Sequence, residues 1–277
     1  MKPKGRFLTA LALILSLFSL LLTGYQVFLR PAGNVKLMKG YRILLAGDSR
    51  SSDDYTFYRE ILEKKSGANV LTDGASGCTA AYNASNEYFS RIISDEHDFS
   101  IWLVGGNDPG SRGTVGTFSP ASPLAAAGEP VVSETDIDSD YAGDTFIQAV
   151  DHMMRKYKTL FYDPAKNASG RIQRMIFCTD LPQQRDSEES EWSLQENWER
   201  KRLAIMECCE KNGIPCLDLY ALCGFDMSFE PMFHAPTDTK TNNGIYYMDG
   251  LHPNPRGIDL ITSLEIRILE QYLLQNN

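Results

Sequence analysis

Apolar runs of strand length alternate with helical patterns along most of the chain. The runs are continuously apolar rather than alternating in polarity, and they cover residues 41–47, 68–74, 99–106, 174–180 and 214–220. Helical patterns cover about residues 54–66, 84–95, 144–160, 188–212 and 256–274. Continuously apolar strands are typical of a parallel sheet that helices cover on both faces. The pattern therefore predicts a three-layer α/β/α fold with a central parallel five-stranded sheet.

Two long connections interrupt this alternation. Residues 109–143 are rich in Gly, Pro, Ser and Ala, and residues 224–248 mix aromatic with turn-forming residues. Long loops in a compact domain are usually lids, binding loops or mobile segments. Both loops follow predicted strands at their carboxyl ends, which is where open α/β sheets bind ligands.

The N-terminus has a different pattern. Lys2, Lys4 and Arg6 precede an uncharged run from Phe7 to Leu29, and no Ala-x-Ala cleavage pattern follows it. An apolar helix of roughly 20 residues spans a bilayer. We therefore expect residues 1–35 to be a cytoplasmic stub, a single-pass transmembrane signal anchor and a linker, and residues 36–277 to be one exported domain. The alternative is a cleaved signal peptide, which would make the protein secreted.

The charge of the exported part argues against one class of partner. The chain has a net charge of −9, and residues 1–35 hold four basic residues and no acidic one, so residues 36–277 carry −13. A domain this acidic is not expected to bind nucleic acid or anionic lipid as its main partner. It suits a neutral or weakly charged substrate.

The six cysteines match neither the spacing of a zinc site nor a C-x-x-C redox pair. We therefore expect no metal and no cofactor. A disulfide is allowed outside the cytoplasm, and Cys216 and Cys223 are the best local candidates for one. Cys78 and Cys178 lie in apolar strand contexts and are expected to be buried free thiols.

Four short blocks carry candidate chemistry. They are "AGDS" (46–49), "DGASGCT" (73–79) and "GGND" (105–108), at the ends of the first three predicted strands, and "DGLHPN" (249–254) near the C-terminus. A serine at the carboxyl end of the first strand displays its hydroxyl on the ligand side of the sheet. Gly-Asp-Ser alone is also an ordinary turn. Four blocks in this order, ending on Asp249 and His252 in a D-x-x-H pattern, are far more specific.

Together the four blocks closely resemble those of the SGNH hydrolases, also called the GDSL esterase/lipase superfamily. The resemblance covers about residues 41–270 and implies a flavodoxin-like fold. It also implies a catalytic triad of Ser49, Asp249 and His252. The oxyanion hole that it implies consists of the N–H groups of Ser49 and Gly77 and the side-chain amide of Asn107.

This assignment fits the chemistry of ester cleavage. A serine becomes a nucleophile when a base lies within ~3 Å of its hydroxyl, and a carboxylate on the far ring nitrogen fixes the tautomer of a histidine base. The oxyanion needs preorganised donors. Each residue also has a simpler interpretation: Asp249 as the cap of a turn, and Asn107 and Asp108 as loop residues in left-handed geometry.

Arg50 departs from the family pattern, which has an apolar residue at this position. A charged side chain beside the nucleophile could contact a polar substrate, so Arg50 and Asp108 are candidate substrate-binding residues. The other histidines are His97, His152 and His234, and none has a D-x-x-H partner. We interpret them as structural or surface residues, with a place beside the substrate as the alternative for His234.

Other enzyme classes fit less well. Metallophosphoesterases need D-x-H and G-N-H-[DE] motifs, and α/β-hydrolases need G-x-S-x-G, and the chain has none of these. We predict an exported, membrane-anchored serine esterase that removes short acyl groups, above all O-acetyl groups, from carbohydrate or cell-envelope substrates. The same triad would serve an acyltransferase, a lysophospholipase or a thioesterase. The alternative from another class is a non-catalytic envelope-binding domain.

The choice of a carbohydrate substrate depends on the second long loop. Aromatic faces stack on sugar rings, and this loop contains Phe225, Phe229, Phe233, Tyr246 and Tyr247. The alternative is that these aromatic residues form the packing core of the loop itself.

Overall fold

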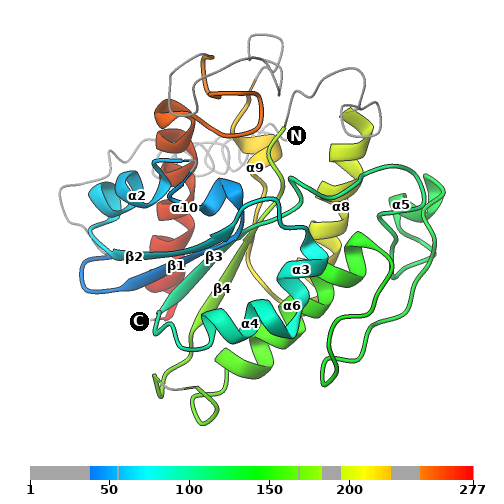
Figure 1. The fold of residues 1–277 in the computed structure, drawn as a ribbon, viewed down its shortest axis with the longest axis horizontal. Helices are drawn as coiled ribbons and strands as arrows, with labels where there is room; N and C mark the ends of the chain where they lie inside the picture. The colour runs from blue at the N-terminus through cyan, green and yellow to red at the C-terminus, as the bar shows by residue number, and fades with distance from the viewer. Residues whose placement is uncertain (1–37, 55, 168, 183–194, 226–243, 277) are drawn as a thin grey trace, which may run out of the picture. The chain divides into compact units, whose positions relative to one another are not determined.

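A parallel sheet of five strands in the order β2-β1-β3-β4-β5 forms the centre of the domain (Figure 1). The computed structural model describes residues 38–54, 56–167, 169–182, 195–225 and 244–276. The strands are β1 (Arg42–Asp48), β2 (Asn69–Ala75), β3 (Phe99–Leu103), β4 (Arg174–Cys178) and β5 (Cys216–Leu217). The predicted five-stranded parallel sheet is confirmed, and its strand order is that of flavodoxin-like folds.

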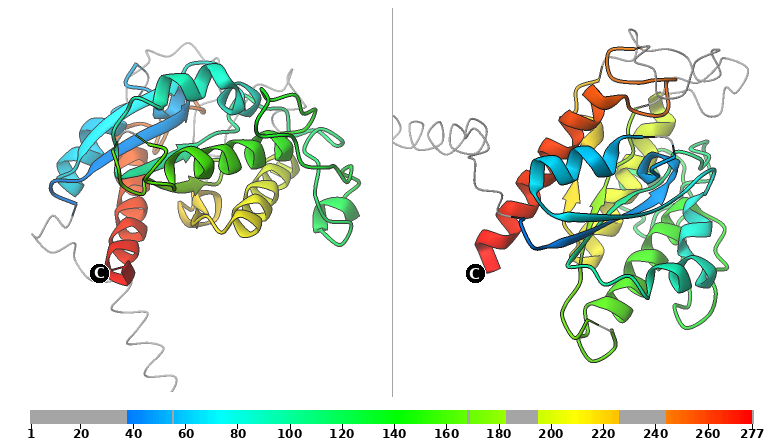
Figure 2. Two further views of the ribbon diagram at one scale, coloured as in Figure 1. Left: turned by 90° about the horizontal axis from the view of Figure 1, so that it is seen from below. Right: turned by 60° about the vertical axis from the view of Figure 1, so that its left-hand side comes forward.

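Helices cover both faces of this sheet. They are α2 (Tyr58–Ser66), α3 (Ala80–Ala84), α4 (Asn86–Ile92), α5 (Pro123–Ala126), α6 (Phe146–Phe161), α8 (Gln195–Asn212), α9 (Leu219–Leu222) and α10 (Pro255–Asn276), with a 3-10 helix η1 (Ser49–Ser51). Ile43 and Leu45 pack toward α2 and α10, whereas Leu44 and Ala46 pack toward α4 and α6. The right-hand view of Figure 2 shows these two helix layers on opposite sides of the sheet. Successive strand residues are therefore buried on opposite faces, which explains the continuously apolar runs.

The structure differs from the predicted elements mainly in its short helices. α3, α5 and α9 each begin after a residue whose side chain accepts a hydrogen bond from a backbone N–H in the first turn. These cap residues are Thr79, Ser122 and Asp218 respectively. Such caps form within segments that have little helical periodicity. β5 is shorter than its predicted run because α9 takes over at Leu219. Residues 188–194 of the predicted fourth helix lie outside the described residues.

Two carboxylates, the buried Glu129 and the half-buried Glu207, hold the long loop 109–143 in place through hydrogen bonds. Glu129 accepts the backbone N–H groups of Gly113, Val115 and Gly116 at 3.0–3.2 Å. Glu207, on α8, accepts the N–H of Phe118 at 2.7 Å and hydroxyl groups from the same loop. The bonds to Val115 and Gly116 satisfy backbone donors that would otherwise be buried without partners. The loop is therefore an integral part of the fold against α8.

The predicted anchor, Phe7–Leu29, and the predicted boundary after residue 35 lie outside the described residues. The compact unit that contains the sheet runs from Met38 to Asn277. Within the described ranges, no helix is both long enough and apolar enough to cross a membrane.

All six cysteines are free thiols, so the predicted Cys216–Cys223 disulfide is wrong. Cys216 packs against the core on the α6 and α8 face, whereas Cys223 is buried in the core on the α2 and α10 face. The two side chains therefore lie on opposite sides of the sheet. Cys178 is buried as expected, whereas Cys78 is partly exposed.

A buried carboxyl group on α10 makes the stability of the fold depend on pH. Glu265 is 0% exposed, accepts a hydrogen bond from the hydroxyl group of Tyr58, and has its pKa raised by burial to about 8. In the unfolded chain the carboxyl group of Glu265 has its ordinary pKa of about 4.5. Between about pH 4.5 and pH 8 this carboxyl group is therefore protonated in the folded state and ionised in the unfolded state. Stability is therefore lost as pH rises from about 4.5 to about 8, by up to about 1.4 kcal/mol for each pH unit.

We expect Glu265→Gln to remove this contribution, because an amide keeps the size of the side chain and cannot ionise. Urea unfolding of wild type and variant at several pH values between 5 and 9 measures the difference. The free energy of unfolding of the variant should fall less steeply with pH than that of the wild type. Parallel curves would show that Glu265 does not bind a proton in the folded state.

Candidate active site

The carboxyl ends of the central strands lie side by side, and the polar blocks follow at this edge. Asp48 pairs with Ala75, Gly47 pairs with Leu103, and Leu103 pairs with Cys178. The residues that come next in each strand are therefore neighbours in space, although long segments separate them in the sequence. This register assembles the first three blocks at one place.

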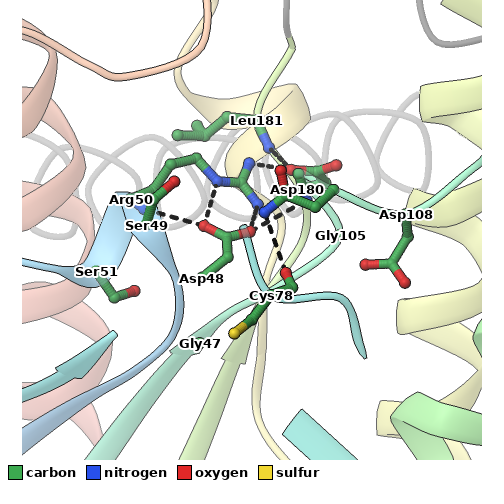
Figure 3. Close-up of polar contacts among 12 residues, drawn as sticks. Gly47, Asp48, Ser49, Arg50, Ser51, Cys78, Gly105, Asp108, Asp180 and Leu181 are labelled. Atoms are coloured by element: carbon green, nitrogen blue, oxygen red, sulfur yellow. Dashed lines mark hydrogen bonds and ion pairs between the residues drawn. The ribbon is translucent and has the colours of Figure 1, made fainter. Parts of the chain in front are cut away.

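Ser49 begins η1 directly after β1. Asp48 caps this short helix, because its side chain accepts the N–H of Arg50 at 3.0 Å. The chain thus turns sharply at the end of the buried strand, and Ser49 is 5% exposed. Figure 3 shows Ser49 beside Asp48 and Arg50 at the strand end.

Ser49, His252 and Asp249 form one continuous chain of hydrogen bonds. The distance from Ser49 Oγ to His252 Nε2 is 2.9 Å, and that from His252 Nδ1 to Asp249 Oδ2 is 2.7 Å. The other carboxylate oxygen, Asp249 Oδ1, accepts the N–H groups of Leu251 and His252 at 3.0 and 2.7 Å. Asp249 therefore contacts the imidazole and also caps the turn that precedes α10, and its place in a catalytic triad stays a prediction.

The environment of Asp249 favours its ionised form. Burial alone would raise the pKa of this carboxyl group, but the hydrogen bonds and charge of His252 and the two backbone N–H groups lower it below its usual value. An ionised carboxylate can hold the proton of the imidazole on Nδ1, which leaves Nε2 as an acceptor toward Ser49.

Gly77 and Asn107 belong to two adjacent loops, after β2 and β3. Gly77 has φ +70°, a backbone conformation that glycine adopts without strain, and no heavy atom lies within 4 Å of the place where a Cβ would stand. Asn107 Nδ2 donates to the carbonyl oxygen of Cys78 at 3.0 Å, which joins the two loops. The amide nitrogen of Asn107 carries a second hydrogen that can donate to a substrate oxygen.

The structure places the two candidate substrate-binding residues, Arg50 and Asp108, in the interior of the domain. The Arg50 side chain is completely buried and forms ion pairs with Asp48 and Asp180 (Figure 3). Asp108 is also buried, and its two carboxylate oxygens lie 3.0 and 2.9 Å from the N–H of Ala80, the first residue of α3. Burial raises the pKa of Asp108 to about 7, against the opposing charge of Lys201.

His97 and His152 are structural residues. His97 is buried, with Nε2 2.6 Å from the hydroxyl of Tyr157, and His152 is buried with Nδ1 2.8 Å from the hydroxyl of Thr135. Burial lowers the pKa of both histidines to about 4. His234 lies outside the described residues.

The described aromatic residues of loop 224–248 pack mainly on one another. Tyr247 is fully buried, and Phe225 stacks on Tyr246 with ring centroids 4.6 Å apart. This arrangement favours the packing interpretation over sugar stacking for Phe225 and Tyr247. Phe229 and Phe233 lie outside the described residues.

Sequence reasoning did not single out Asp180 or Lys201, which the structure brings next to Arg50. A signal for Asp180 is present in the sequence, because it is the polar residue that ends the fourth predicted run, two positions after β4 (Arg174–Cys178). Lys201 lies within α8 and has no comparable signal. In the part of the chain that the structure describes, no group of three or more His, Cys, Asp or Glu residues could hold a metal ion.

Comparison with known proteins relates this chain to others by structure. No protein-family model and no curated protein matches the sequence. A possible lipase from Chitinophaga pinensis has 15% identity and a TM-score of 0.57, over 84% of this chain and 99% of that one. A GDSL-like lipase candidate from Parabacteroides merdae has 14% identity and a TM-score of 0.50, over 84% of this chain and 98% of that one.

An acetylxylan esterase from Geobacillus stearothermophilus, Axe2, has 13% identity and a TM-score of 0.50, over 84% of this chain and 95% of that one. Its structures are those of catalytic mutants, in which alanine replaces an aspartate or a histidine three positions further along. The chain has the fold of the GDSL/SGNH hydrolases, which is the fold that the four sequence blocks implied.

Proposed function

We propose that the protein is a serine esterase of the SGNH type. The observation that carries this proposal is the continuous chain from Ser49 Oγ through His252 to Asp249, with distances of 2.9 and 2.7 Å. In the first half-reaction Ser49 Oγ attacks the ester carbonyl and its proton passes to His252 Nε2. The imidazolium then protonates the leaving alkoxide, which leaves an acyl group on Ser49. Water, deprotonated by His252, releases the acid and restores the serine.

The loops after β1, β2 and β3 supply donors for the oxyanion. In this proposal the N–H groups of Ser49 and Gly77 and the side-chain amide of Asn107 bind the negative oxygen that forms during attack. The bond from Asn107 to the Cys78 carbonyl already holds this amide against the loop of Gly77. Donors that are fixed before the reaction need not reorganise when charge develops, and each typically contributes about 10²–10³ in turnover.

The D-x-x-H spacing gives separate support. Axe2 has a catalytic aspartate and histidine three positions apart, and Asp249 and His252 have the same spacing and are directly hydrogen-bonded. A non-catalytic binding domain would have no need of this linkage to the serine. An acyltransferase remains the second candidate, since an acceptor hydroxyl can replace water in the second half-reaction.

For the substrate we propose short acyl esters, in particular O-acetyl groups on carbohydrates of the cell envelope. The net charge of −13 on residues 36–277 suits neutral glycans better than anionic lipids. The likeness to an acetylxylan esterase points in the same direction. Lysophospholipase and thioesterase activities are the alternatives.

A series of aryl esters with increasing acyl length tests this substrate class. We expect kcat/KM to be highest for acetyl esters and at least about tenfold lower for octanoyl esters. Acetylated oligosaccharides should also be cleaved faster than acetylated simple alcohols. A rate that rises steadily with acyl length would instead identify a lipid esterase.

We also propose that the catalytic domain is exported and tethered by a signal anchor at residues 7–29. The basic residues before this apolar run and the lack of a cleavage pattern after it support the proposal. The full-length protein should fractionate with membranes and be digested by protease added to intact cells. A soluble secreted form that begins near residue 30 would show that the segment is cleaved.

A further inference from the structure

Four charged side chains form a buried chain of ion pairs behind the nucleophile. Asp48, Arg50 and Asp180 are 0% exposed, and Lys201 is 1% exposed. Arg50 Nε lies 2.9 Å from Asp48 Oδ1, and its Nη1 bonds to Asp180 Oδ1. Lys201 Nζ lies 3.0 Å from Asp180 Oδ2. Figure 3 shows the Arg50 guanidinium between the two carboxylates. Removing four charges from water is costly, so their placement here calls for an explanation beyond stability.

This ion-pair chain forms hydrogen bonds with the backbone of the turn Gly105–Asp108, which contains Asn107. At one end, the Gly106 N–H donates to Asp48 Oδ2 at 3.1 Å. At the other end, Lys201 Nζ donates to the carbonyl oxygen of Gly105 and, at 3.2 Å, to that of Asp108. The Asp108 N–H closes the turn onto the Gly105 carbonyl at 3.2 Å. The backbone on both sides of Asn107 is therefore held by charged side chains.

The same ion-pair chain also fixes the backbone next to the proposed nucleophile, Ser49. Asp48 Oδ1 accepts the N–H of Arg50, the residue after Ser49, while its other oxygen accepts the N–H of Gly106, the residue before Asn107. One carboxylate thus sets the positions of two candidate oxyanion donors relative to each other. The fit is tight: a Cβ on Gly106 would lie 2.9 Å from Arg50 Cζ and 2.9 Å from Asp48 Oδ2.

The charges in this chain compensate one another. Burial alone would raise the pKa of Asp180, but the positive charges of Arg50 and Lys201 lower it below its usual value. Asp180 is therefore ionised between two cations. Removing either cation would leave a buried carboxylate with one partner fewer, and the turn beside it would be expected to shift.

We propose that Lys201 and Arg50 are positioning residues that fix the oxyanion hole through the turn around Asn107. This inference rests on the proposed esterase function and assigns to Arg50 a role other than substrate contact. Lys201 acts through the carbonyls of Gly105 and Asp108 and through Asp180. Loss of its ammonium group should therefore impair stabilisation of the transition state while substrate binding is largely kept.

The test compares Lys201→Met with Lys211→Met in the full-length protein. Both lysines lie on α8 and pair with a buried aspartate, but Lys211 pairs with Asp151, at 2.6 Å, on α6. We expect Lys201→Met to lower kcat for an aryl acetate by about 100-fold, with KM changed by less than about threefold. Lys211→Met should leave kcat per folded molecule within about threefold of wild type. Unchanged kcat in Lys201→Met, or equal losses in both variants, would overturn the proposal.

A double-mutant cycle with Asn107→Ala shows whether Lys201 acts through this amide. If it does, the double variant Lys201→Met, Asn107→Ala should have a kcat less than about threefold below that of Asn107→Ala alone. Additive losses would mean that Lys201 supports the fold rather than the donor. If Lys201→Met does not fold, Lys201→Gln takes its place in the same cycle. If the folded wild type hydrolyses no ester, the esterase function itself is refuted. If the wild type is active and Lys201→Met leaves kcat unchanged, only the positioning role is refuted.

Discussion

Ser49→Ala is expected to lower kcat for a short-chain aryl ester by about 10⁴-fold or more, because the proposed acyl-enzyme forms on the hydroxyl of Ser49. The loss should fall on kcat with little change in KM, since one buried hydroxyl contributes little to ground-state binding. The rate measured after exhaustive purification should approach that of the free ester in buffer. The circular dichroism and melting temperature of the variant should match those of the wild type.

Ser51→Ala is the matched control for this experiment. Ser51 lies in the same 3-10 helix and is also buried, but its hydroxyl donates to the carbonyl oxygen of Ala46, 3.2 Å away, rather than to a histidine. Its replacement should keep kcat within about threefold. Wild-type turnover in Ser49→Ala would show that the nucleophile lies elsewhere, and equal losses in both variants would point to damage of the helix rather than of the chemistry.

Asp249→Asn should lower kcat by about 10³–10⁴-fold, a loss of the size known when an amide replaces the carboxylate of a Ser-His-Asp triad. The amide can present an N–H where the carboxylate accepts the proton of His252 Nδ1, at 2.7 Å. The imidazole would then be driven toward the tautomer that carries its proton on Nε2 and cannot deprotonate Ser49. The geometry of the turn should survive, because the amide oxygen can still accept the N–H groups of Leu251 and His252.

Asp218→Asn gives the comparison for Asp249→Asn. Asp218 also caps a helix, α9, and accepts hydrogen bonds from Arg202. We expect this variant to lose some stability and to keep its turnover. Kinetics of both variants at a fixed fraction folded separate the two effects. A similar kcat for Asp249→Asn and wild type would mean that the aspartate only caps its turn.

Much of the fold could be predicted because strands buried on both faces have an unmistakable pattern. β1 to β4 lie within or next to their predicted runs, because each alternates its side chains between two helix-covered faces. β5 is shorter than predicted, because the residue that caps α9, Asp218, ends the strand early. The choice between strand and capped turn there depends on one side-chain hydrogen bond, which apolar periodicity does not reveal.

The candidate site was predictable to the extent that it lies at strand ends. Ser49, Gly77 and Asn107 each follow a strand, and the parallel register brings the ends together. Sequence position did not reveal which way a side chain turns: Arg50, next to Ser49, points into the core because the 3-10 helix rotates it toward Asp180. Lys201 contacts Asp180 from α8, a helix later in the chain, and no local sequence pattern predicts such a contact.

The close packing of Gly106 against Arg50 has a consequence for how this protein can diverge. Any side chain at position 106 would collide with the guanidinium and with Asp48. A descendant lineage could therefore gain a larger residue at position 106 only after position 50 had become smaller, and the two aspartates would then have to lose or exchange their charges as well. These positions are expected to be inherited as one unit, so that a search for distant relatives should score them jointly rather than one column at a time.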